Sequence, residues 1–322
     1  MAHIQLLGTG GTIASRSHGT GGAVATDTSA ALIPKHHRDV TVHARDVLTI
    51  GSYRLDLADL HRIAEAVGQA LADPGTDGVV VTHGTDTLEE TAFLLDLVHA
   101  SPKPVVLTGA QRTADSPDAD GPRNVAEAVL AAADVRLRGT GALISFDGTV
   151  RSARGARKVH TTAGSAFGGG SEVAHMAGSG LVVTAAPRRY PVLPIPPAEF
   201  DTVRVEVITA YPGATPELMD HAVQLGSRAV VLAGTGVGNA GPGFAEAVKR
   251  ATGSGCIVLL STRVPWGPVV PTYGNGGGID LTAAGAVPSG DLNPFQARIL
   301  AAVLLSAGTA PDRFSEAFET YL

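Results

Sequence analysis

Hydroxyl and carboxylate side chains stand where apolar segments of the chain give way to glycine-rich turns. These side chains belong to Thr12, Ser52, Thr85 and Asp86. A threonine hydroxyl can attack a carbonyl carbon, but at neutral pH it is a weak nucleophile and needs a neighbouring base. Lys158 is a candidate for that base, because a lysine in a partly buried polar site can give up its proton. The spacing along the chain does not bring Lys158 close to Thr85, so this chemistry is a hypothesis.

Each of these residues also has a purely structural interpretation. Thr12 is a candidate capping hydroxyl in a tight turn, and Ser52 follows a glycine as an ordinary turn residue would. Thr85 and Asp86 precede a predicted helix and are residue types typical of helix N-caps. A lone lysine is usually a solvated surface charge. Which interpretation holds depends on the elements that carry these residues.

Strand and helix patterns alternate along the chain, which predicts an α/β fold with a mainly parallel sheet flanked by helices. Because the carboxyl ends of parallel strands meet at one edge of a sheet, the residues that follow them are expected to line one crevice. The segment 15–31 is rich in Gly, Ser, Thr and Ala and predicts a long mobile loop beside Thr12. Thr87 and Glu90 predict a capping box for the helix that ends near His99. Predicted strands cover residues 4–7, 47–50, 78–81, 104–107 and 142–146, and predicted helices cover residues 56–72, 88–99 and 123–133.

The chain of 322 residues is long enough for two domains with separate cores. A proline-rich segment over residues 187–197 is typical of a semi-rigid linker, and a second series of strand and helix patterns follows it. We therefore expect a larger N-terminal α/β catalytic domain over residues 1–188, a linker over residues 189–202 and a smaller C-terminal α/β domain over residues 203–322. Within the last of these, strands are expected at 229–232 and 257–260, and helices are expected to begin at Pro216 and Pro294.

The composition is that of a compact globular protein, with 44% hydrophobic and 17% charged residues. A formal net charge of −6 and an aromatic content of 4% argue against nucleic acid as the main partner. No apolar run reaches the ~18 residues of a membrane span, so no membrane partner is expected. The N-terminal residues lack the charged and apolar regions of a signal peptide. A cytoplasmic protein is therefore expected, although an exported form whose leader has been removed would look the same.

The sequence predicts neither a metal ion nor an organic cofactor. His36, His37 and the other histidines do not have the spacing of metal ligands with cysteines or carboxylates. The glycine-rich segment 8–14 has Ile13 where the dinucleotide-binding fingerprint needs a small residue, and it lacks the Gly-Lys-Ser/Thr of a P-loop. The single cysteine, Cys256, lies in an apolar run and is expected to be a small buried hydrophobe.

Two segments of the chain closely resemble the signature segments of bacterial-type L-asparaginases, which belong to the asparaginase/glutaminase family. They are residues 9–14, TGGTIA, and residues 77–91, DGVVVTHGTDTLEET. The second segment is long and specific, so a chance match is not expected. The resemblance continues in the same order through residues 104–110, 120–122, 236–239, 261–265 and 289–298, and so it covers both predicted domains.

This resemblance implies an amidohydrolase that converts L-asparagine and water to L-aspartate and ammonia, with minor glutaminase activity as a further expectation. Thr12 matches the nucleophile of the family, which forms an acyl-enzyme with the carbonyl carbon of the side-chain amide. Thr85 matches the residue that positions or activates the attacking water, and Lys158 matches the residue that tunes its basicity. Asp86 matches the group that binds the α-ammonium of the substrate.

Further substrate contacts are implied in the same way. Ser52 matches a contact to the α-carboxylate, and Ala110 matches a main-chain contact to the substrate amide. These assignments agree with the chemistry, because an amino-acid substrate needs an anion for its ammonium group and donors for its carboxylate and its reacting carbonyl oxygen. The resemblance also implies a homodimer or homotetramer whose sites are shared between subunits.

The chain departs from the family pattern around the nucleophile. Segment 15–52 contains no tyrosine, whereas the family usually carries one there that helps to activate the nucleophile. Tyr53 stands in place of the usual glutamine, and segment 266–278, where the family carries a glutamate, has no acidic residue. We hypothesise that Tyr273 from a partner subunit, or Tyr53, replaces the missing loop tyrosine. The same departures leave the preference for asparagine over glutamine open.

Two other functions fit the same residues. An amidotransferase subunit that delivers ammonia from glutamine to a tRNA-linked substrate would resemble this family, but it is expected to carry an extra domain before the asparaginase-like core. An amino-acid-binding or sensing protein would keep the pocket and lose turnover. The missing tyrosine and the missing glutamate are the features that favour this second alternative.

Overall fold

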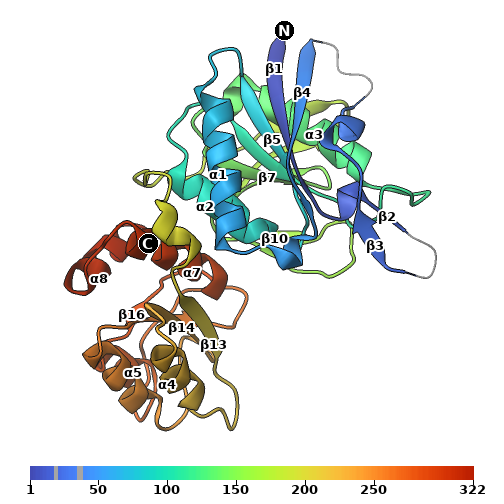
Figure 1. Ribbon diagram of the computed structural model, residues 1–322. Coiled ribbons are helices and arrows are strands. Elements are labelled where there is room, and N and C mark those ends of the chain that lie inside the picture. Colours follow the sequence, from blue (N-terminus) through green and yellow to red (C-terminus); the bar gives the residue numbers. More distant parts are fainter. Residues whose placement is uncertain (18–20, 35–38) are drawn as a thin grey trace. The chain divides into compact units, whose positions relative to one another are not determined.

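The computed structural model describes residues 1–17, 21–34 and 39–322 (Figure 1). The described chain forms two compact units, Met1–Ile195 and Pro196–Leu322. The division falls inside the segment 189–202 that the sequence predicts as a linker. Both units combine helices with a mainly parallel sheet, so the predicted α/β class is confirmed. The finer assignment of a catalytic domain, a linker and a C-terminal domain stays a prediction.

An eight-stranded sheet forms the centre of the first unit. Its strands are β1 (Ala2–Gly10), β4 (Val40–Ile50), β5 (Gly78–Thr82), β6 (Val105–Thr108), β7 (Ala142–Phe146), β8 (Thr149–Ser152), β11 (Glu172–Ala177) and β12 (Gly180–Val183), and its helices are α1 (Leu57–Ala72), α2 (Leu88–Val98) and α3 (Gly121–Ala133). The strand order is β12-β11-β8-β7-β6-β5-β1-β4. Neighbours from β4 to β7 run parallel, and β8, β11 and β12 extend the sheet antiparallel.

Helices cover both faces of this sheet. α1 and α2 lie on one face and α3 lies on the other (Figure 1). Val125 and Val129 of α3 pack in one buried cluster with Leu6 of β1 and Val80 of β5. Strands that are buried on both faces are expected to be apolar nearly throughout, and every residue of β5 is buried. This packing makes the sheet a rigid base for the turns at its edge.

The order of the strands places a topological switch point at β1. From β1 the chain passes to β4 on one side, and it then returns to β5 on the other side of β1. In open α/β sheets, ligands bind outside the carboxyl ends of the strands at such a point. The predicted site residues follow these ends: Thr12 follows β1, Ser52 follows β4, and Thr85 follows β5.

A short hairpin stands in the segment that the sequence predicts as a long mobile loop. β2 (Ser15–Ser17) and β3 (Ala23–Ala25) pair antiparallel, with Ser15 opposite Ala25. The guanidinium group of Arg16 donates two hydrogen bonds to Asp27, at 2.7 and 2.8 Å, and so ties the hairpin at its base. The loop prediction is therefore wrong for the two strands, because each has only three residues, too few to show a strand pattern in the sequence.

The N-terminus of α2 also differs from its prediction. Thr87 occupies the N-cap position, but its side chain makes no capping hydrogen bond. Its hydroxyl donates instead to the carbonyl of Ser52, at 3.1 Å. The predicted capping box of Thr87 and Glu90 is therefore wrong, and the hydroxyl ties the start of α2 to the turn after β4. A capping box does form at α1, between Asp56 and Asp59.

The remaining elements of the first unit are short. β9 and β10 pair antiparallel in a small separate sheet, and 3-10 helices follow several strands. Their bounds are β9 (Ala156–Lys158), β10 (Phe167–Gly169), η1 (Thr12–Ala14), η2 (Ser29–Leu32), η3 (Ser52–Arg54) and η4 (Val135–Leu137). Lys158 is thus carried by a strand outside the main sheet.

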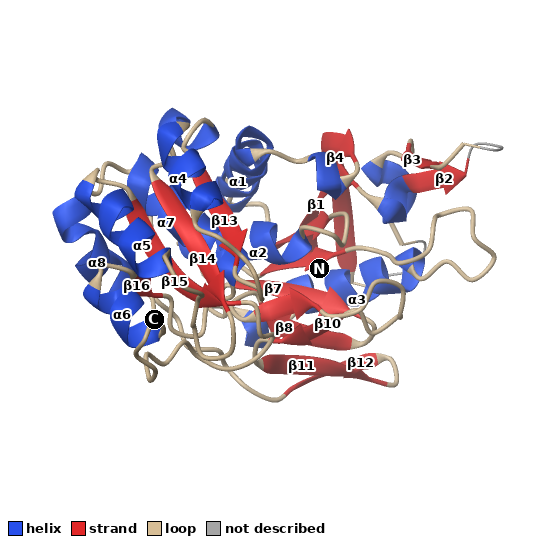
Figure 2. Ribbon diagram, turned by 90° about the horizontal axis from the view of Figure 1, so that it is seen from below, coloured by secondary structure: helices blue, strands red, loops and turns tan. Residues whose placement is uncertain are grey.

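The second unit is built around a four-stranded parallel sheet with the order β13-β14-β15-β16 (Figure 2). Its elements are η5 (Ala198–Asp201), β13 (Val205–Thr209), α4 (Glu217–Gln224), β14 (Ala229–Gly234), α5 (Phe244–Gly253), β15 (Ile257–Thr262), α6 (Gly278–Ala283), β16 (Val287–Pro288), α7 (Pro294–Ser306) and α8 (Pro311–Glu319). Met219 of α4 and Phe244 of α5 pack with Val230 and Val258 of the sheet. Asn293 caps α7 with Pro294 as its first residue, as predicted. None of the described helices is long and apolar enough to cross a membrane.

Candidate active site

Thr12 opens η1 directly after β1. The backbone turns there through Gly10 and Gly11, whose φ angles of 90° and 81° lie in the region that glycine adopts readily. The N–H of Gly11 donates to the carbonyl of Ile50 at 2.9 Å, which ties this turn to the end of β4. Within residues 1–17, 21–34 and 39–322, no hydrogen-bond partner of the Thr12 hydroxyl is found. The hydroxyl is therefore available for chemistry.

Three turns converge on Gly84. A Cβ atom on Gly11 would lie 2.4 Å from the backbone of Gly84, and a Cβ atom on Gly84 would lie 2.5 Å from the Oγ atom of Ser52. Such distances are far below van der Waals contact, so only glycine fits at both positions. These glycines bring the turns after β1, β5 and β4 into direct contact, which explains how Thr12, Ser52 and Thr85 come to share one site.

A cavity of about 240 Å³ opens at this point. Its lining includes Thr12, Ser52, Tyr53, Thr85 and Asp86, together with residues of the β2–β3 hairpin. The Ser52 side chain is 3% exposed, and its Oγ atom has no hydrogen-bond partner in the described structure. A buried polar group left in this state costs about 1–3 kcal/mol. The Ser52 hydroxyl is therefore suited to bind a polar group of a ligand.

Lys158 reaches this site from β9. Its Nζ atom lies 2.8 Å from Oγ1 of Thr85 and 2.8 Å from Oδ1 of Asp86. The Lys158 side chain is 17% exposed, whereas that of Asp86 is 55% exposed and faces solvent at the cavity. The structure thus brings together the threonine, the lysine and the carboxylate that the sequence could only name separately.

A glutamine completes the surroundings of Thr85. The Thr85 hydroxyl donates to Oε1 of Gln111 at 3.3 Å, and Nε2 of Gln111 donates to the carbonyl of Ala163 at 3.1 Å. Sequence reasoning missed Gln111, although a signal was present. It follows the end of β6, the next parallel strand beyond β5, one residue after the predicted site residue Ala110.

Ala110 itself is fully buried at the end of β6. The turn that contains it is held by Asp120, whose carboxylate accepts hydrogen bonds from the backbone N–H groups of Gln111 and Arg112 at 2.9–3.2 Å. The amide of Asn124 also donates to the carbonyl of Gly109 at 2.9 Å. This turn is therefore fixed, as a main-chain contact to a substrate requires.

The two tyrosines proposed to replace the missing loop tyrosine lie in different units. Tyr53 lines the cavity and is 75% exposed, with its ring over the face of Gly51. Tyr273 belongs to the second unit, in the loop between β15 and α6, and is 60% exposed. All residues that line the cavity belong to the first unit. Of the two tyrosines, only Tyr53 lines the cavity together with the other site residues.

A buried histidine supports the turn at Gly84. His83 is fully buried, with Nδ1 2.7 Å from the carbonyl of Gly84 and Nε2 3.0 Å from the hydroxyl of Thr91. Burial lowers the pKa of His83 to about 4, so the ring is neutral at physiological pH. His83 is thus a fixed hydrogen-bonding group below the site.

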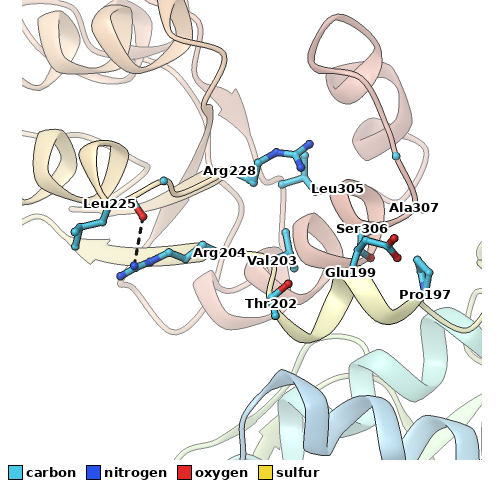
Figure 3. Close-up of a pocket in the computed structure, with 12 residues that line it drawn as sticks. Pro197, Glu199, Thr202, Val203, Arg204, Leu225, Arg228, Leu305, Ser306 and Ala307 are labelled. Atoms are coloured by element: carbon cyan, nitrogen blue, oxygen red, sulfur yellow. Dashed lines mark hydrogen bonds between the residues drawn. The ribbon is translucent and has the colours of Figure 1, made fainter.

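A larger cavity, of about 790 Å³, lies in the second unit between η5 and the C-terminal ends of α4 and α7 (Figure 3). Arg204 on its wall donates to the carbonyl of Leu225 at 3.4 Å and pairs with Glu206 at 3.0 Å. The hydrogen bond to Leu225 holds the end of α4. The lining of the larger cavity includes Thr202 and Ser306. At the smaller cavity, Lys158 contacts the lining residues Thr85 and Asp86, so we take the smaller cavity as the candidate active site.

Among the described residues, no group of three or more histidine, cysteine, aspartate or glutamate side chains is arranged to hold a metal ion. His36 and His37 lie outside the described residues. Cys256 is buried, and burial raises the pKa of its thiol to about 11, as expected for a small buried hydrophobe.

The fold and the site define a two-unit α/β protein with threonine, lysine and carboxylate groups at the switch point of its larger sheet. The chain belongs to the asparaginase/glutaminase family: residues 3–186 match the family model "Asparaginase, N-terminal", and residues 204–318 match "Glutaminase/Asparaginase C-terminal domain". This confirms the resemblance found in the sequence.

Similar proteins cover the chain from end to end. It is 36% identical to "Probable L-asparaginase" of Deinococcus radiodurans, over 99% of this chain and 97% of that protein. It is 31% identical to "L-asparaginase 2" of Escherichia coli, over 100% of this chain and 94% of that protein. The crystal structure of "Probable Cytoplasmic L-asparaginase" from Campylobacter jejuni superposes with a TM-score of 0.87 and 28% identity, over 100% of both chains.

Proposed function

We propose that this protein is an L-asparaginase, which hydrolyses L-asparagine to L-aspartate and ammonia through a threonine acyl-enzyme. The observation that carries the mechanism is the position of Lys158 Nζ, 2.8 Å from both Thr85 and Asp86 at a cavity lined by Thr12. Family membership and the full-length similarity to named L-asparaginases support the reaction. They do not favour a sensing protein or an amidotransferase subunit.

In the first half of the proposed reaction, Thr12 Oγ1 attacks the side-chain amide carbon of asparagine. The hydroxyl proton passes to a base, the C–N bond breaks, and the nitrogen leaves as ammonia after gaining a proton. The product is an aspartyl ester of Thr12. In the second half, water held by Thr85 attacks this ester, and one water proton passes through the Thr85 hydroxyl to the unprotonated amine of Lys158. This proton is then delivered to the Thr12 oxygen as the ester bond breaks. Aspartate leaves and Thr12 regains its proton.

The remaining residues bind the substrate. Asp86, a carboxylate half exposed at the cavity, binds the α-ammonium group, and the unpartnered hydroxyl of Ser52 donates to the α-carboxylate. The main chain at Ala110 contacts the substrate amide, and Tyr53 lies at the cavity wall. The proposal includes no cofactor and no metal ion.

Ammonia release tests this function directly. We expect the purified protein to release ammonia from L-asparagine with saturation, and more slowly from L-glutamine, because the similar proteins that cover the whole chain are named L-asparaginases. The measurement is coupled ammonia detection over a range of both substrates. Tight binding of aspartate by calorimetry with no ammonia from either substrate would instead favour the sensing protein.

The two tyrosines make a second prediction. If Tyr273 of a partner subunit takes the proton from Thr12, Tyr273→Phe should lower kcat by about 10²-fold or more, because a general base contributes that much. Tyr53→Phe should then leave kcat within a few-fold of the wild type. The reverse pattern would assign the role to Tyr53, and unchanged turnover in both variants would exclude both residues.

We further propose that the protein is a homodimer or homotetramer whose sites are shared between subunits. Apolar side chains that are exposed in the second unit support this, because such surface is typical of interfaces. They include Trp266 at 53%, Val270 at 46%, Tyr273 at 60% and Ile279 at 47% exposure. A cytoplasmic location is also part of the proposal. The Campylobacter jejuni structure carries that description, whereas the similar Haemophilus influenzae protein is described as periplasmic.

A further inference from the structure

Glu89 is a buried acid beside the candidate site that no step of the proposed reaction uses. It is the second residue of α2 and is only 5% exposed. Acidic side chains near the start of a helix usually face solvent, so this burial needs a cause. The Oε2 atom of Glu89 accepts a hydrogen bond from the backbone N–H of Lys158, at 2.5 Å. The acid therefore contacts the main chain of the residue whose side chain reaches Thr85.

The strand β9 offers Lys158 little other support. It has three residues and pairs with β10 in a sheet of its own, outside the eight-stranded sheet. The next N–H along the chain, of Val159, donates to the carbonyl of Ala166 at 2.8 Å on the β10 side. Successive N–H groups of a strand point in opposite directions, so the N–H of Lys158 points away from β10 and toward α2. Without Glu89 this donor would lose its partner.

Glu89 adds a further contact between Lys158 on β9 and the start of α2. Thr85 and Asp86 stand immediately before α2, and Glu89 stands in its first turn. Lys158 is bound to this segment twice, by its Nζ atom to Thr85 and Asp86 and by its backbone N–H to Glu89. A long lysine side chain has many rotamers, and fixing its main chain limits the positions that its Nζ atom can reach.

We propose that Glu89 is a positioning residue of the hydrolysis reaction, whose carboxyl group fixes the main chain of Lys158 so that its Nζ atom stays on Thr85. This inference rests on the proposed function. Glu89 is not among the residues that line the cavity, and it acts through Lys158.

The protonation of Glu89 adds a pH dependence. Burial raises the pKa of Glu89 to about 7 from its ordinary value of 4.5, and the hydrogen bond from Lys158 opposes the rise. The charged groups that face it are Arg157 and Lys158 on β9 and Glu90 on its own helix. A charged acceptor binds an N–H more strongly than a neutral one. The hydrogen bond from the N–H of Lys158 to Glu89 should therefore become stronger as pH rises through about 7.

The folding stability, in contrast, should decrease as the pH rises through the same range. Because the pKa is higher in the folded than in the unfolded state, the folded state favours the protonated acid. The contribution of Glu89 to stability is fully present below about 4.5 and is lost as pH rises through about 7. Ionisation of Glu89 thus strengthens the hydrogen bond that fixes Lys158, while it lowers the stability of the fold.

Three variants test the proposal. Glu89→Gln keeps the size of the side chain and a carbonyl acceptor, and Glu89→Leu removes the acceptor. We expect Glu89→Leu to lower kcat by about 10²-fold with little change in KM, as a misplaced catalytic group does. Glu89→Gln should recover most of this loss, to within about 10-fold of the wild type, and its pH profile should lack the rise near 7. The control variant is Glu127→Gln. Glu127 lies on α3 and, like Glu89, accepts a hydrogen bond from a backbone N–H, that of Gly148 at 2.9 Å. The kcat and the pH profile of this control should match those of the wild type.

Melting temperature separates positioning from a merely structural role. At pH above 8 we expect Glu89→Gln to melt at or above the wild-type temperature although its kcat is lower. If kcat and melting temperature fall together, or if Glu89→Gln keeps the wild-type kcat and pH profile, the proposal is overturned. Glu89→Gln keeps the test valid if Glu89→Leu does not fold.

An NMR measurement separates this inference from the proposed function. With lysine-selective isotope labelling, the amide shift of Lys158 should titrate near pH 7 in the wild type and stay constant in Glu89→Gln. That result would stand even if the protein released no ammonia, in which case the proposed function alone would fail. A wild-type amide shift of Lys158 that does not titrate would contradict the proposed contact.

Discussion

Thr12→Ala is expected to lower kcat/KM for L-asparagine by at least about 10³-fold, since removal of a nucleophile leaves only the activity of the remaining binding groups. The fold should be retained, because the hydroxyl has no hydrogen-bond partner within the described residues and its loss leaves no buried group unpaired. The check is steady-state ammonia release together with the melting temperature of the variant.

Thr12→Ser is the matched control for this variant. It keeps a hydroxyl at the same position and should retain measurable turnover. Near-wild-type ammonia release by Thr12→Ala, combined with a large loss in Thr85→Val, would transfer the role of nucleophile to Thr85.

Lys158→Met removes the proposed base of the second half of the reaction. The variant keeps the length of the side chain but removes the amine that lies 2.8 Å from Thr85 and Asp86. We expect kcat to fall by about 10²–10⁴-fold, the usual contribution of a positioned acid or base. The melting temperature should change little, because an ion pair with a half-exposed carboxylate contributes little to stability.

Lys103→Met is the control for the loss of a lysine. The Nζ atom of Lys103 donates to the carbonyls of Leu71 and Asp73, at 2.8 and 2.7 Å, and touches no residue of the site. This variant should keep the wild-type kcat. A kcat of Lys158→Met within about 3-fold of the wild type would remove the lysine from the proposed mechanism.

The parts of the site that lie at strand ends could be predicted from the sequence. Thr12, Ser52 and Thr85 each follow an apolar segment, and parallel strands bring their carboxyl ends together. The order of β4, β1 and β5 in the sheet confirms that convergence. The two signature segments carried the family resemblance, and family membership is confirmed over both units.

The contacts that depend on distant segments could not be predicted in this way. Lys158 lies 73 residues from Thr85, on a strand outside the main sheet, and no local pattern marks the contact. Glu89 looks like an ordinary acid in the first turn of a helix, and only the packing of β9 against it reveals its burial. Its role was therefore invisible in the sequence.

The error at the start of α2 has the same origin. Thr87 and Glu90 have the residue types and spacing of a capping box, but the Thr87 hydroxyl finds the carbonyl of Ser52 instead. The tertiary hydrogen bond to Ser52 replaces the local capping hydrogen bond, and it connects two turns of the site. The departure from the rule therefore lies where the function is proposed.

In the proposed mechanism, Thr12 carries the acyl group during hydrolysis. Lys158→Met should slow the attack of water on the ester, so that acid quenching during turnover of L-asparagine traps the intermediate. Peptide mass spectrometry of the quenched protein is expected to find one aspartyl group on the peptide that contains Thr12, and none when Thr12 is also replaced by alanine. An aspartyl group on Thr85 or on another residue would rule out Thr12 as the nucleophile.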